Sequence, residues 1–274
     1  MKKLAALLLG VVLALGSVGF FPAAAAEAYF ADGYNGSTYE GSYIEIINYA
    51  SKADSEIYIP GAVPKYYDTT ALLNTCANTA GAILLGYYDG DYNNLIPNFE
   101  SKRVILNKVL FSSMASPVQE VINDLYTRMG TNVGGAGTTV QGFKEGMQSY
   151  VQSKGRNISF TSVVSNGSIN TSAYKNAVNS ETPMALFVSK YSMLSLTCID
   201  RYEEYDEYDV LKYGGNHVLI AYGIREIKYY DEYGAQFREV TLLQVATGYD
   251  EDPLVYVLVD DRIEFVDGYA VTIY

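Results

Sequence analysis

The spacing of apolar residues is typical of helices before about residue 158 and of strands after it. This order of helices followed by strands limits the folds that the chain can adopt. Small and apolar residues recur at helical spacing over residues 71–88, and further helical stripes follow at 118–129 and 139–153. Apart from a short helix at 171–178, the rest of the chain alternates as strands do. Helices that precede strands favour an α+β fold with segregated layers over an alternating parallel sheet.

The last third of the chain predicts a long β-hairpin. Residues 217–250 form two strand-like runs that are separated by a turn signal at 231–234. Counting outward from this turn places Ala246 or Thr247 beside His217. The acidic, tyrosine-rich run at 201–209 is predicted to be a solvated loop.

The N-terminus has the composition of an export signal. Two lysines precede an apolar stretch, and small residues with an A-x-A pattern follow at Ala24 and Ala26. A spanning helix is the alternative, because the apolar run could just cross a bilayer. The alanine-rich end favours cleavage, so residues 1–26 are predicted to be a signal peptide and the mature chain to start near Glu27. We therefore expect a secreted or envelope-associated protein without a stable membrane anchor.

Charge and residue usage exclude several functions. The chain has 31 acidic and 19 basic residues and no basic patch, which argues against nucleic acid or an anionic membrane as a partner. One histidine and scattered carboxylates do not give the ligand spacing of a zinc site, and the acidic turn at 249–253 lacks EF-hand spacing. No metal and no cofactor are predicted, and the expected partner is a peptide or protein substrate.

Two residues have the pattern of a nucleophile and a general base. Cys76 lies at the predicted start of the first helix, in NTCANTAG, and the single histidine, His217, begins a strand in GGNHVLIAYG. A cysteine attacks a carbonyl carbon as the thiolate, and the N–H groups and dipole of a helix start stabilise that charge. Gly214 and Gly215 would let backbone or substrate approach the base.

Each residue also has a structural interpretation. A small cysteine at an apolar helix start is ordinary core packing, and a lone histidine on a strand can be a buried residue with a satisfied hydrogen bond. The only other cysteine is Cys198, and exported cysteine pairs often form a bridge. A Cys76–Cys198 disulfide is therefore the main alternative to a catalytic thiol.

Several motifs together resemble those of papain-like cysteine peptidases, in particular the exported bacterial branch of streptopain and the bacteriocin-leader-peptidase-like proteins. The motifs are CANTA from Cys76, the tyrosines that close that helix, TTVQGFKEGMQSY, GGNHVLIAYG and VATGYD. The resemblance implies a helical lobe that carries the cysteine, packed against an antiparallel sheet lobe that carries the histidine. Residues 61–274 would form the peptidase domain, and residues 27–60 an N-terminal extension or a pro-segment.

By this resemblance Cys76 is the nucleophile and His217 the general base of a secreted cysteine peptidase or amidase. The family's third residue, an asparagine or aspartate, corresponds to Ala246, and its oxyanion glutamine corresponds to Thr70. Thr247 and Asp250 are the nearest substitutes for the third residue, and Asp250 is the one predicted. The alternative function is a catalytically impaired relative that binds peptide or glycan, for which 27 tyrosines supply aromatic contact surface.

Overall fold

The computed structural model describes residues 29–30, 38–60, 63–99, 103–105, 108–110, 116–195, 205–249 and 255–274. The predicted signal peptide at 1–26, Cys198 and Asp250 lie outside these ranges. The signal peptide, the Cys76–Cys198 bridge and the catalytic role of Asp250 therefore stay predictions.

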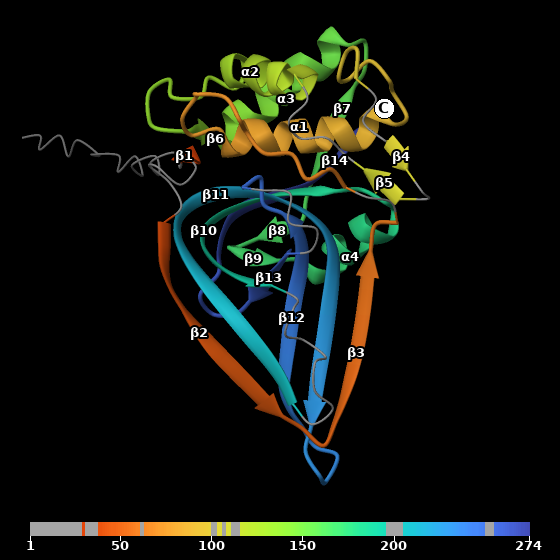
Figure 1. Cartoon of the computed structure of the whole chain (residues 1–274), viewed down its shortest axis with the longest axis vertical. Coiled ribbons are helices and arrows are strands. Elements are labelled where there is room, and N and C mark those ends of the chain that lie inside the picture. The colour runs from red at the N-terminus through yellow and green to blue at the C-terminus, as the bar shows by residue number, and fades with distance from the viewer. Residues whose placement is uncertain are drawn as a thin grey trace, which may run out of the picture.

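Four helices occupy the positions that the sequence pattern predicts: α1 (Cys76–Asp89), α2 (Ser116–Arg128), α3 (Val140–Ser153) and α4 (Thr171–Asn179). The first helix begins at Cys76, because Asn74 has a φ of 64°, which a right-handed helix cannot contain. Helices α1, α2 and α3 stack at one end of the molecule, with α1 closest to the sheet (Figure 1).

Antiparallel strands form most of the described structure. The largest sheet has eight strands, namely β2 (Thr38–Asn48), β3 (Ser51–Tyr58), β7 (Ile158–Ser162), β10 (Met184–Ser195), β11 (Tyr205–Tyr230), β12 (Gln236–Ala246), β13 (Val255–Val259) and β14 (Glu264–Ile273). Three two-stranded pairs accompany it: β1 (Tyr29–Phe30) with β6 (Thr138–Thr139), β4 (Arg103–Ile105) with β5 (Lys108–Leu110), and β8 (Val164–Ser165) with β9 (Ser168–Ile169).

Strand β11 is 26 residues long and arches across the molecule. Its first half, up to Gly214, pairs with β2, and its second half, from Gly223, pairs with β3. Both ends of β11 lie near the turn between β2 and β3, since Tyr205 pairs with Asn48 and Tyr230 with Ser51. The middle of the arch passes beneath α1 (Figure 1).

The acidic run that was predicted to be a loop is a strand from Tyr205 onward. Alternate residues point inward, and Asp206 and Tyr208 are buried while Asp209 is exposed. The Lys52 ammonium lies 2.9 Å from the Asp206 carboxylate, and the Tyr229 hydroxyl donates to the same carboxylate at 2.7 Å. A charged run can form a strand here because its one inward carboxylate is neutralised.

The strands and helices enclose two cores. Strands β10 and β12 each pair with both β11 and β13, so these four strands form a closed ring of hydrogen bonds. Side chains from all four strands and from β2 make one core: Ile47, Leu194, Tyr208, Val210, Ile227, Tyr229, Val240, Leu242, Tyr256 and Leu258. The larger core joins α1, α2 and α3 to the centre of β10 and β11.

The expected papain-like α+β fold is therefore wrong. The described structure is mainly antiparallel sheet, and the helices do not form a lobe of their own. Every residue of α1 except Tyr87 is buried, and its side chains share one core with β10 and β11. A helix that is buried all round lies within a core, not on the wall of a cleft between lobes.

Residues 38–58, within the region predicted to be an extension or pro-segment, form β2 and β3 and pair with both halves of β11. The predicted boundary at residue 60 therefore divides strands of one sheet. Within the ranges that the structure describes, none of the helices has the length and hydrophobicity needed to cross a bilayer.

Candidate functional site

Cys76 is the first residue of α1, at the helix start where the sequence places it. The first backbone bond of the helix runs from the Thr79 N–H to the Thr75 carbonyl at 2.8 Å. The N–H groups of residues 76–78 precede it, and the Thr75 side chain does not cap them. These groups carry the partial positive charge of the helix start beside the thiol.

Side-chain hydrogen bonds hold the start of α1 in place. The Thr75 hydroxyl donates to Asp68 at 2.8 Å, and the Asn74 amide donates to Asn132 at 2.8 Å. Thr70, which stands where the resemblance expects a glutamine, also donates its hydroxyl to Asp68, at 3.0 Å. The Thr70 side chain thus supports the loop before the helix, and the N–H groups of residues 76–78 are the oxyanion donors that the site offers.

His217 lies in the arch of β11, opposite Val188, and its ring is oriented by a backbone carbonyl. Its Nε2 atom lies 2.8 Å from the carbonyl oxygen of Thr247. Because a carbonyl only accepts, Nε2 carries the proton in this hydrogen bond, and in the neutral ring Nδ1 is then the basic nitrogen. The Thr247 carbonyl therefore does what the third residue of a triad does: it sets the tautomer.

Two tyrosines fix the plane of the imidazole. The Tyr249 ring stacks on His217 with centroids 4.4 Å apart and planes at 9°, and the Tyr191 ring stacks at 5.8 Å and 20°. The hydroxyls of Tyr191 and Tyr249 lie 2.8 Å apart and form a hydrogen bond. The two stacked rings and this hydrogen bond hold the imidazole in one orientation.

The loop after β12 links the histidine to the cysteine helix. Thr247 contacts the His217 ring, and the next residue, Gly248, packs on Thr79 of α1. A Cβ atom placed on Gly248 would lie 3.3 Å from the Thr79 methyl group, and the φ of Gly248 is 77°. Thr79 lies one helical turn after Cys76. The loop thus joins the histidine ring to the first turn of the helix that carries the cysteine.

Gly214, one of the glycines before His217, lies against β2. A Cβ atom at Gly214 would overlap the carboxylate of Glu40 from β2, which forms an ion pair with Arg262. The Arg262 guanidinium also donates to the Tyr213 carbonyl at 3.1 Å. The missing side chain at Gly214 therefore makes room for the Glu40 carboxylate.

Of the two positions expected beside His217, Thr247 lies at the ring and Ala246 does not. Ala246 pairs with Ile220 and not with His217, because the hairpin is centred on residue 233, with Tyr230 opposite Gln236. Thr247 contacts the ring through its carbonyl, while its hydroxyl accepts the N–H of Tyr249 at 3.2 Å. The stacking tyrosines and the carbonyl were missed. Tyr249 lies in the VATGYD motif, but a backbone acceptor has no sequence signature.

Both candidate side chains are buried, with exposed fractions of 4% for Cys76 and 1% for His217. Cys76 belongs to the larger core, as its structural interpretation requires. In the part of the chain that the structure describes, no three histidine, cysteine or carboxylate side chains come close enough together to hold a metal ion.

Similarity to known proteins does not assign this site to a family. No family model matches the chain, no curated protein is similar to it, and no solved structure matches it. The resemblance to papain-like peptidases therefore rests on the short sequence motifs alone.

Proposed function

We propose that the protein is a thiol hydrolase that cleaves peptide or amide bonds through a thioester on Cys76, with His217 as general base. The observation that carries this proposal is the loop at 247–249, which orients the His217 ring and packs on the first turn of α1. The loop that orients the base thus also contacts the helix that begins at the nucleophile. Asp250, the predicted third residue, is not required in this scheme.

In the proposed reaction, Nδ1 of His217 takes the proton of the Cys76 thiol, and the thiolate adds to the carbonyl carbon of the substrate. The N–H groups at the start of α1 stabilise the resulting oxyanion. The imidazolium then protonates the leaving amine as the C–N bond breaks and the thioester forms. Water, deprotonated by His217, hydrolyses the thioester, which releases the acid and restores the thiol.

Alkylation of the purified protein tests whether Cys76 is a reactive thiol. Iodoacetamide should modify Cys76 faster than Cys198 in the folded protein, because a helix start raises the thiolate fraction. His217→Gln should slow that modification while leaving the modification of Cys198 unchanged. Peptide mapping by mass spectrometry measures both rates. A Cys76–Cys198 disulfide in the exported protein, or modification of Cys76 only after denaturation, would contradict the proposal.

Binding without cleavage is the second candidate function, and the burial of Cys76 and His217 favours it. A side chain that is 1% exposed cannot exchange protons with a bound substrate unless the structure opens. If this candidate is correct, Cys76 is a core residue, and its replacement changes stability but not ligand affinity.

We also propose that the protein is exported and that the mature chain starts near Glu27, as the composition of residues 1–26 indicates. Expression of the full chain should yield protein in the culture supernatant with a new N-terminus near this residue. N-terminal sequencing measures it. Recovery of the uncleaved chain from membranes alone would show that residues 1–26 act as an anchor.

A further inference from the structure

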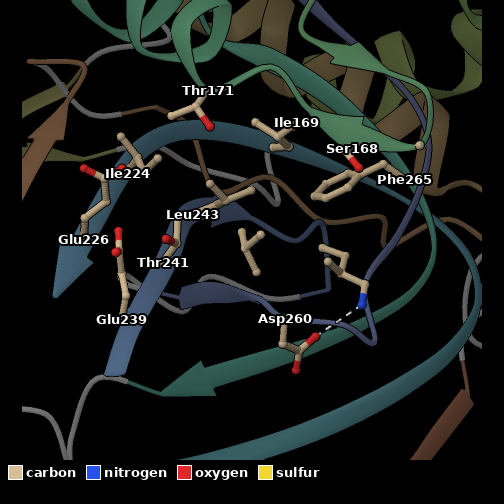
Figure 2. A pocket seen from close by; sticks show the side chains of 13 residues that line it. Ser168, Ile169, Thr171, Ile224, Glu226, Glu239, Thr241, Leu243, Asp260 and Phe265 are labelled. Atoms are coloured by element: carbon tan, nitrogen blue, oxygen red, sulfur yellow. Dashed lines mark hydrogen bonds between the residues drawn. The ribbon is translucent and has the colours of Figure 1, made fainter. Parts of the chain in front are cut away.

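A cavity of about 300 Å³ lies away from the two candidate catalytic side chains. It is bounded by β11, β12, the turn between β13 and β14, the β8–β9 turn and the start of α4 (Figure 2). None of the residues that contact His217 or the first turn of α1 lines it. Its apolar lining comprises Ile169, Ile224, Leu243, Val259, Ile263 and Phe265.

The charged residues of this cavity are all acidic. Glu226 and Glu239 lie on one side of the cavity and Asp260 lies below it in the view of Figure 2. The residues that line it include no lysine, arginine or histidine. A cavity with apolar walls and carboxylates at its margin attracts a cation that also has an apolar part.

Each of these three carboxylates contacts neighbouring protein groups through one of its two oxygens. The Lys175 ammonium lies 2.7 Å from Oε2 of Glu226, and the Gln236 amide donates to Oε2 of Glu239 at 3.2 Å. Oδ1 of Asp260 accepts the N–H groups of residues 262 and 263 at 3.0 and 3.2 Å. Lys175 therefore competes with any bound cation for Glu226, while Asp260 also stabilises its own turn.

We propose that this cavity binds a basic side chain, lysine or arginine, with its methylene stem on the apolar lining and its charged end at Glu226 and Glu239. The volume lies at the lower end of the range for ligand pockets, which suits one side chain better than a large ligand. A free alkylamine also has an apolar stem and a positively charged end, so the same contacts would hold it. This site does not depend on the proposed hydrolysis, because it shares no residue with it.

Calorimetric titration of the Cys76→Ala protein with three probes tests the site without turnover. N-acetyl-L-lysinamide should bind at least about threefold more tightly than N-acetyl-L-norleucinamide, which has a similar stem without the charge. The affinity for the lysine probe should fall as salt is added. Pentylamine distinguishes the source: tighter binding of the lysine probe indicates a peptide ligand, and equal binding indicates a free amine. Equal affinity for the two amides would overturn the proposal.

Matched variants separate this site from general attraction to an acidic protein. Glu239→Gln should weaken binding of the lysine probe by about two- to fivefold. Glu232→Gln removes the same charge from the β11–β12 turn, outside the cavity, and should leave the affinity unchanged. Lys175→Met removes the internal competitor and should tighten binding. Equal weakening by the two glutamate variants would show that the cavity is not the binding site.

Discussion

Replacing Cys76 with alanine should lower the rate of peptide or amide hydrolysis by about a thousandfold or more. The reason is that the thioester cannot form without the thiol, so only transition-state binding by the remaining groups is left. His217→Gln should have an effect of the same order, because the glutamine amide cannot act as a general base. Turnover of casein and of fluorogenic peptide amides by purified mature protein measures both.

Two further variants make this test specific. Cys198→Ala removes the other thiol and should leave the rate unchanged, unless the two cysteines form a bridge. Ala246→Asn should not raise the rate, because this position pairs with Ile220 and Nε2 of His217 is already bonded to the Thr247 carbonyl. Hydrolysis that persists in Cys76→Ala at the wild-type rate would exclude the thiol mechanism.

Above about pH 10 the protein should lose stability steeply and unfold before about pH 12. Burial raises the pKa of Tyr174, Tyr208 and Tyr229 well above the ordinary tyrosine value. Burial also raises the pKa of Tyr87 to about 12, with Glu181 and Asp91 adding to the shift. In this range the folded chain holds more protons than the unfolded chain, so the free energy of unfolding falls as pH rises.

The expected size of this effect is large. Each tyrosine that stays protonated in the fold while the unfolded chain ionises removes about 1.4 kcal/mol of stability per pH unit. Several buried tyrosines together therefore remove a large part of the stability of a typical domain.

Urea unfolding at several pH values, together with the ultraviolet absorbance of tyrosinate, measures this loss of stability. Tyr229→Phe should make the loss less steep, whereas Tyr233→Phe, at a position that is 86% exposed, should not. A folded protein with every tyrosine ionised would contradict the prediction.

The helices and the hairpin could be predicted because their signals are local. The apolar stripe of α3 and the turn after Tyr230 need only neighbouring residues, and both lie where the pattern places them. The path of β11 could not be predicted. Its acidic first half becomes a strand only because Lys52 and Tyr229, far away in the sequence, neutralise Asp206.

Prediction of the candidate site was limited in the same way. The residue types of Cys76 and His217 suggest a nucleophile and a general base. The helix that carries Cys76 and the strand that carries His217 were also expected. The atom that orients the imidazole is the backbone carbonyl of Thr247, and any residue at that position would supply it. The sequence could not reveal this group, because the structure uses a backbone atom where the papain-like pattern has an asparagine or aspartate side chain.

The pairing of β11 with β2 and β3 constrains the order in which the molecule can fold. Residues 38–58 leave the ribosome long before residues 205–230, which supply their partners in the described part of the sheet. Until then the two strands expose unpaired backbone edges, which are sites of aggregation, and contacts between residues so distant in sequence form slowly. The first strands of this large sheet thus find their native neighbours only after most of the chain has been made.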